Sequence, residues 1–79
     1  MTTDELLQDA LAKLDSAGGE LILDFSSVRR IGPAAIGAMV KLATAAEAKA
    51  VKVALIGVNI DVYKVLKLVN LTPRFSFPA

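Results

Sequence analysis

The chain has 79 residues, of which 54% are hydrophobic, and its formal net charge is +1. This length fits one small domain, which buries roughly 60–65% of the surface that its unfolded chain exposes. The sequence has no cysteine and no histidine, so disulfides, the usual zinc and haem sites, and serine–histidine or cysteine–histidine nucleophile pairs are excluded.

The even charge balance and the lack of long apolar runs limit where the chain can act. A net charge of +1 favours neither nucleic acid nor an anionic membrane as a partner. No apolar run approaches the roughly 20 residues of a membrane span, and the acidic start at Asp4 and Glu5 is unlike a targeting peptide. We therefore expect a cytoplasmic protein. The hydrophobic fraction fits either a parallel sheet buried on both faces or apolar surface kept for a partner.

A first helix is predicted over residues 4–17, where apolar residues recur at helical spacing: Leu7, Ala10, Leu11 and Leu14. Thr2 and Glu5 have the spacing of a capping box before this helix. A glycine pair ends it, because glycine adopts the left-handed conformation easily. Residues 20–25 follow as a short apolar strand.

A second helix is predicted over residues 33–50, because Pro33 suits a first helical position. Its inward stripe is expected to be Ile36, Met39, Val40 and Ala43. A second strand is predicted over residues 52–58, which are mostly β-branched.

Asn59 is a good N-cap for a third helix over residues 60–71. Its inward residues are expected to be Val62, Val65, Leu66 and Val69. Residues 74–77 alternate in polarity and predict a short last strand. Strands joined through helices in the order α-β-α-β-α-β form a mostly parallel sheet with right-handed crossovers. The sequence therefore predicts one small α/β domain over residues 1–79.

Three features could carry chemistry, and each has a simpler structural explanation. Residues 32–37 open a helix but lack the lysine and the glycine run of a phosphate-binding loop. Asp24 and Asp61 fall near strand ends, although nothing else indicates a substrate pocket, and Asp24 can hydrogen-bond to loop backbone. Phe75 and Phe77 could stack on nucleic acid, but the net charge favours packing. We therefore expect no catalysis and no cofactor.

Several stretches resemble one known family when they are taken in order. Residues 21–28, Leu-Ile-Leu-Asp-Phe-Ser-Ser-Val, resemble the apolar-apolar-Leu-Asp-Leu-Ser strand of STAS domains, the sulfate transporter and anti-sigma factor antagonist family. Residues 31–37 resemble the stretch that follows, and residues 53–58 the next strand. Residues 65–71 resemble the Val-Leu-x-x-x-Gly-Leu helix end, and residues 75–77 the final strand. The order and spacing of the pieces carry the resemblance.

The resemblance implies a STAS-like fold and a regulatory domain that binds proteins without catalysis. Bacterial members bind a kinase-like anti-sigma factor when unphosphorylated, and phosphorylation of a serine at the start of the second family helix breaks that complex. Here the family's Asp-Ser-x-Gly-Leu-Gly falls on Gly-Pro-Ala-Ala-Ile-Gly, so Gly32 holds the aspartate position, Pro33 the phosphoserine position and Ala34 the next. The usual switch is therefore expected to be absent, with Ser26 and Ser27 as substitutes to consider.

Family members usually begin with two strands before the first helix, whereas three residues precede Asp4 here. Either the chain is trimmed or it is a minimal variant. Loss of those strands would expose a sheet edge or an apolar face. We therefore expect a homo-oligomer, such as a homodimer.

The partner is expected to bind the loop and helix start, where Arg29 and Arg30 would orient an acidic protein beside a small uncharged patch. The predicted contact residues are Val28, Arg29, Arg30, Gly32, Pro33, Ala34, Ile36, Gly37 and Lys41, with Ala38 and Leu42 on the same helix face. The expected partner is a kinase-like anti-sigma factor, in regulation of transcription. The alternatives are an accessory STAS subunit of a membrane transporter, a scaffold of a signalling assembly, and a small enzyme or nucleotide-binding protein.

Overall fold

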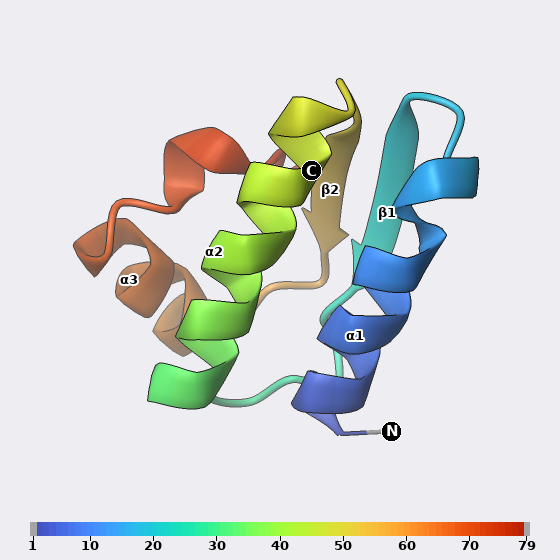
Figure 1. Ribbon diagram of the computed structural model, residues 1–79. Coiled ribbons are helices and arrows are strands. Elements are labelled where there is room, and N and C mark those ends of the chain that lie inside the picture. Colours follow the sequence, from blue (N-terminus) through green and yellow to red (C-terminus); the bar gives the residue numbers. More distant parts are fainter. Residues whose placement is uncertain (1, 79) are drawn as a thin grey trace.

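The computed structural model describes residues 2–78, along which helices and strands alternate (Figure 1). In chain order, the elements are helix α1 (Thr3–Lys13), the 3-10 turn η1 (Leu14–Ser16), strand β1 (Glu20–Asp24), helix α2 (Pro33–Ala48), strand β2 (Lys52–Ile56), helix α3 (Ile60–Leu68) and the 3-10 turn η2 (Thr72–Arg74). The predicted α/β class is confirmed.

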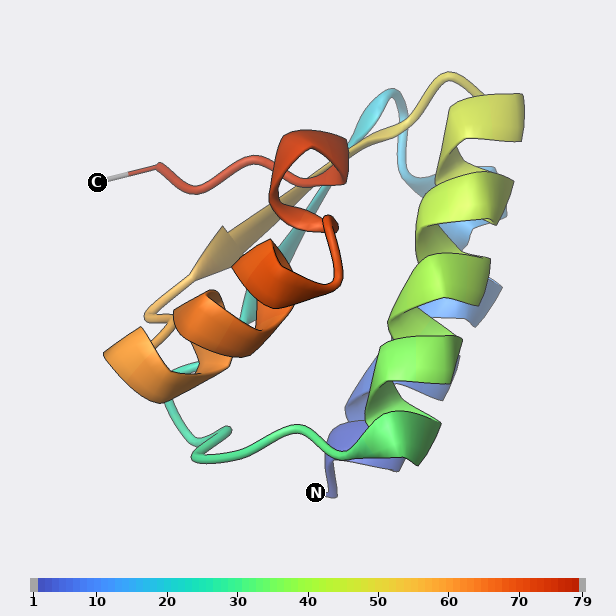
Figure 2. The same cartoon turned by 90° about the vertical axis from the view of Figure 1, so that its left-hand side faces the viewer.

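β1 and β2 form a parallel pair that is in register throughout, with Glu20 opposite Lys52 at one end. α2 lies in the connection between them, since parallel strands need a long crossover. α1 and α2 pack against each other and cover one face of the pair, as Figures 1 and 2 show. Leu23 on that face is buried, whereas Ile22 on the opposite face is 57% exposed. The sheet is therefore not buried on both faces along β1, and part of the apolar surface remains open.

The predicted last strand is reduced to a single residue pair. Ser76 forms an isolated parallel bridge with Ala54 at the outer side of β2. Its N–H donates to the Val53 carbonyl and its carbonyl accepts from the Leu55 N–H, both at 2.8 Å. A 3-10 turn precedes this segment and Pro78, which has no N–H, follows it. Too few residues are left between them to extend the ladder.

The helix ends depend on where the backbone turns left-handed. The end of the first predicted helix tightens into η1, and Gly18 and Gly19 follow with φ of 64° and 100°. α2 and α3 end before their predicted bounds, because Ala50 and Asn70 have φ of 56° and 61°. These conformations cannot continue a right-handed helix.

The core fills the space between the helices and the covered face of the sheet. Its largest fully buried side chains are Phe25, Leu7, Leu14, Met39, Leu42, Leu55, Leu66, Leu71 and Val62. Two predicted inward residues are wrong, since Val40 and Val69 are 40% and 41% exposed. Leu42, which is expected on the outer face of α2, is buried instead. An alanine-rich helix has little polarity contrast between its faces, so its inward stripe is hard to assign from sequence.

Candidate partner-binding site

The loop between β1 and α2 is anchored by two buried side chains. Phe25 and Val28 are almost fully buried, and the Val28 N–H donates to the Phe25 carbonyl at 2.9 Å. Asp24 Oδ1 accepts from the Ser26 N–H at 2.8 Å, in a turn that is typical of aspartate. Hydrogen bonds from the side chain and the backbone of Ser26 hold the pKa of the Asp24 carboxyl below its ordinary value. The predicted hydrogen bond between the Asp24 carboxylate, as acceptor, and the loop backbone is thus confirmed.

Asn59, at the start of α3, also anchors this loop through side-chain hydrogen bonds. Its Oδ1 accepts from the Val62 N–H at 2.8 Å and caps α3, as predicted. Its Nδ2 donates to the carbonyls of Val28 and Arg29, both at 3.2 Å. The sequence predicts the cap but gives no signal for the second role, because these carbonyls lie 31 and 30 residues away in the chain.

Gly57 allows the loop to approach the end of β2 closely. Its φ is +70°, and a Cβ placed on it would lie 2.9 Å from the Ser26 Cβ and 3.1 Å from the Ser26 Cα and backbone N. A side chain at this position meets both a strained conformation and a steric clash, so only glycine fits.

Most predicted contact residues reach the surface, with one correction. Val28 is 5% exposed and cannot contact a partner; it anchors the loop instead. Ile36 and Ala38 are half-buried. The remaining predicted residues are exposed: Arg29, Arg30, Gly32, Pro33, Ala34, Gly37 and Lys41.

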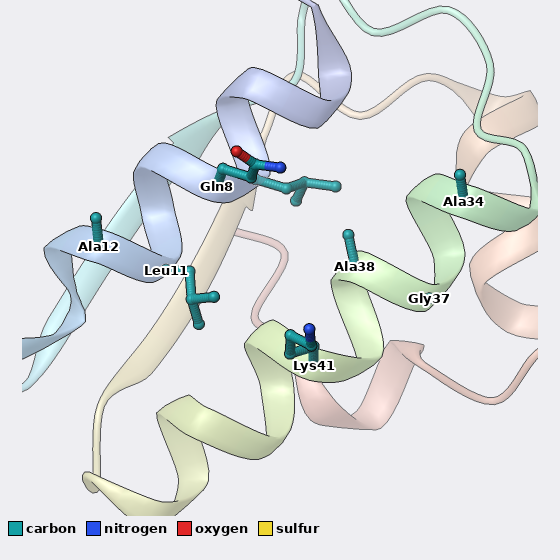
Figure 3. A pocket seen from close by; sticks show the side chains of 8 residues that line it. Gln8, Leu11, Ala12, Ala34, Gly37, Ala38 and Lys41 are labelled. Atoms are coloured by element: carbon teal, nitrogen blue, oxygen red, sulfur yellow. The ribbon is translucent and has the colours of Figure 1, made fainter.

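An open groove of about 620 Å³ lies between α1 and the first turns of α2 (Figure 3). It is lined by Leu7, Gln8, Leu11, Ala12, Ala34, Gly37, Ala38 and Lys41. Figure 3 shows Leu11 and Ala38 projecting from the two helices that flank it. The α2 wall consists mostly of alanine and glycine, so a partner can approach the helix backbone closely. No aspartate or glutamate lines the groove.

The α1 wall of the groove is the part that sequence reasoning misses. Leu7 and Leu11 belong to the predicted inward stripe; Leu7 is buried in the core as predicted, whereas Leu11 is only half-buried and reaches the groove. The available signal lies on α2, where Ala34, Gly37 and Ala38 share one helix face at spacings of three and four. Side chains this small cannot fill the space between two helices, so a hollow is expected beside them.

The start of α2 offers no group that could carry a phosphate. Its N-cap is Gly32, which makes no side-chain cap, and Pro33 occupies the first turn. Residues 31–38 contain no serine, threonine or tyrosine. The surface at the start of α2 therefore consists mostly of small side chains without charge.

The other candidate residues are accounted for by packing and capping. Phe75 is buried, and the ring of Phe77 meets Tyr63 edge-on with 5.3 Å between centroids. Asp61 lies in the first turn of α3, where the helix dipole favours a carboxylate. Within residues 2–78, no cluster of acidic side chains could hold a metal ion, and every described helix is too short or too polar to cross a membrane.

Comparison with protein families decides the identity of the fold. The model of the STAS domain matches residues 1–78. The chain belongs to the STAS domain family. The resemblance inferred from the sequence is thus confirmed for this STAS domain, including the helix before the first strand.

Two solved structures share the fold of the STAS domain. The crystal structure of a candidate anti-sigma factor antagonist from Thermotoga maritima matches with a TM-score of 0.77 and 21% identity, over 95% of this chain and 65% of that one. The NMR structure of the same protein matches with a TM-score of 0.75 and 20% identity, over 98% and 65%. The STAS domain thus spans about two thirds of the length of these neighbours. No curated protein gives a significant match.

Proposed function

We propose that this STAS domain regulates a partner protein by binding it, without catalysis, at the groove between α1 and α2 and the adjoining loop. The observation that carries the proposal is the groove itself, which is open, largely apolar and bordered by small residues of α2. Membership of the STAS family and the fold of an anti-sigma factor antagonist support a kinase-like anti-sigma factor as the partner, in the cytoplasm.

The chemistry of the surface indicates which segment of the partner would bind. Leu11 is half-buried and offers apolar contact in the groove, and Lys41 lies on its wall. Arg29 and Arg30 are exposed on the loop that leads into α2. This arrangement suits an apolar helix of the partner that carries acidic residues along its border.

We further propose that binding is not switched by phosphate at the usual family position. A phosphate would add about −1.5 to −2 charges to the interface. Gly32, Pro33 and Ala34 have no hydroxyl that could accept it. The surface would therefore remain in the binding-competent state without a phosphate, and regulation would come from elsewhere.

Two substitutions on the α2 wall test the proposal against the purified anti-sigma factor of the same genome. Ala34→Glu places a negative charge on the exposed helix start. Gly37→Leu fills the groove, and a Cβ there meets nothing within 4 Å. Leucine also favours a helix interior over glycine by roughly 0.5–1 kcal/mol, so this variant should fold at least as well as the parent. Both should weaken binding about tenfold or more, measured by calorimetric titration.

Ala48→Glu is the matched control, because it adds the same charge to the exposed far end of α2. It should bind like the parent. Equal binding by all three variants would remove the groove from consideration. If light scattering shows a complex only with a transporter subunit, the domain is an accessory subunit of a transporter. If the chain alone forms large assemblies as its concentration rises, the domain is a scaffold of a signalling assembly.

A further inference from the structure

Helix α3 packs on the core with one side and leaves the opposite side exposed. Val62 and Leu66 are 1% and 0% exposed and face the core. At about 3.6 residues per turn, Lys64 lies about 160° around the helix from each of them, and it is exposed. Figure 1 shows α3 at the side of the molecule away from α1. The face of α3 that is centred on Lys64 therefore points to solvent.

This face carries two large apolar side chains that the fold does not cover. Among the large apolar residues that the structure describes, Leu68 and Ile60 are the most exposed, at 85% and 72%. Each lies four positions from Lys64, so the three residues form one stripe along the helix. Scattered exposed apolar residues are normal, whereas apolar residues gathered on one stripe indicate a contact surface.

A hollow of about 390 Å³ lies on the C-terminal half of the same face, lined by Lys64, Lys67 and Leu68. We call it the α3 hollow. Residues at spacings of three and four on a helix surround the kind of hole that receives a side chain of a facing helix. The two lysines contribute their carbon chains to its walls, because their charged ends can remain in water. The α3 hollow can therefore accept an apolar side chain.

A second copy of α3 that runs in the opposite direction supplies that side chain. With the two Lys64 residues at the centre, Ile60 of each copy comes against the α3 hollow of the other, since both features lie about one turn from the centre. The acidic first turn of each helix, with Asp61, then lies beside the C-terminal half of the other, which carries the lysines. Antiparallel helix dipoles add to this attraction.

The charges on this face favour a second copy over an anionic membrane. Asp61 gives the face a carboxylate beside its lysines, which a uniformly negative surface does not complement. A stable interface buries roughly 800 Å² per partner, and the exposed side of a helix of 9 residues is smaller. The two copies of Lys64 also repel each other at the centre. The association should therefore be weak and reversible.

We propose that two copies of this STAS domain associate weakly through antiparallel α3 helices, with Ile60 of each copy seated in the α3 hollow of the other. The same patch is used on both copies, so the contact closes at a dimer. The groove of the proposed function is lined by residues of α1 and α2, so the two surfaces are separate. The homodimer expected from the sequence would then form through α3.

Sedimentation of the chain at concentrations from about 10 μM to about 1 mM tests the proposal, since weak dimers form in this range. The mass should rise towards that of a dimer and no further. Ile60→Ala removes the inserted side chain and should weaken association about tenfold or more. Alanine favours a helix and Ile60 is exposed, so this variant should keep its fold in circular dichroism.

Ile22→Ala is the matched control, because it makes the same change at another exposed isoleucine, on β1. It should associate like the parent. Gly37→Leu should also associate like the parent, which separates this surface from the groove whether or not the groove binds its partner.

Lys64→Glu tests the antiparallel arrangement directly. In a mixed dimer, the new carboxylate meets the Lys64 of the parent, so opposite charges replace like charges at the centre. In NMR titrations, the α3 amides of the isotope-labelled parent should shift more with unlabelled Lys64→Glu than with unlabelled parent. High salt should reduce this difference.

A parent chain that stays monomeric over the whole range would overturn the proposal. So would undiminished association of a folded Ile60→Ala variant, or equal shifts with Lys64→Glu and with the parent. Binding of the monomer to vesicles with phosphatidylserine, abolished by Ile60→Ala, would also overturn it, because the occupant of α3 would then be a membrane.

Discussion

Asn59 joins α3 to the candidate site loop, so graded substitutions there can separate two contributions to stability. Its Oδ1 caps α3 through the Val62 N–H, and its Nδ2 holds the carbonyls of Val28 and Arg29. Asn59→Ser keeps an oxygen that can cap the helix but is too short to reach the loop. Asn59→Ala removes both functions.

The magnitudes follow from the contacts. Loss of an N-cap costs about 1 kcal/mol. Each hydrogen bond contributes about 0.5–1.5 kcal/mol net, and the two bonds to the loop lie at the long end of the normal range. We therefore expect Asn59→Ser to lower the free energy of unfolding by about 1–2 kcal/mol, and Asn59→Ala by about 2–3 kcal/mol. A domain of this size has a total stability of about 5–15 kcal/mol, so both effects are measurable.

Urea unfolding followed by circular dichroism gives both values, provided that the slope with denaturant is unchanged. Hydrogen exchange in the same variants reports whether the loop around Val28 opens. If Asn59→Ser is as stable as the parent and its loop amides are equally protected, the anchoring role is refuted. If Ser and Ala variants are equally unstable, the cap contributes nothing.

Three further variants test the backbone and the loop carboxylate. Gly57→Ala should lower the free energy of unfolding by about 1–3 kcal/mol in the same titration, because its Cβ would meet Ser26 in a left-handed conformation; an unchanged midpoint would contradict the close approach. Ala50→Gly should raise it by about 1 kcal/mol, since alanine at φ 56° is strained, and a loss of stability would show that this strain is absent. The hydrogen bonds from Ser26 hold the folded pKa of Asp24 below its ordinary value, so its contribution to stability is present above the unfolded pKa and is lost as pH falls through the folded pKa. Asp24→Asn should therefore be less stable at neutral pH and show a shallower acid loss in a pH series of thermal melts; a parallel curve would contradict the contact with Ser26.

The sequence predicts the elements because their signals are local. The capping box of Thr2 and Glu5 is present, with the Glu5 N–H donating to Thr2 Oγ1 at 3.2 Å. The cap at Asn59 and the glycine stop after α1 depend equally on near neighbours in the chain. Such features are decided within a few residues, which is why they can be predicted without knowledge of the fold.

The errors arise where long-range packing decides. Val28 is predicted as a contact residue, since it lies in a polar loop, but the packing of that loop on the core buries it. Val40 is predicted to face inward and Leu42 outward, but the structure has Val40 exposed and Leu42 buried. The sequence misassigns them because nearly every residue around them is small and apolar. The groove combines α1 with α2, so it cannot be derived from the pattern of one segment.

The buried position of Val28 explains how the candidate surface is presented. Val28 and Phe25 fix the loop from inside, and Asn59 fixes its carbonyls, so Arg29 and Arg30 project from a backbone that is already held. A loop that is ordered before binding loses less conformational entropy when the partner arrives. A surface without a phosphate switch would gain affinity from this rigidity, because its binding-competent shape needs no signal to form. Loosening the loop by Asn59→Ser should therefore weaken the partner complex even though Asn59 lies outside the groove lining.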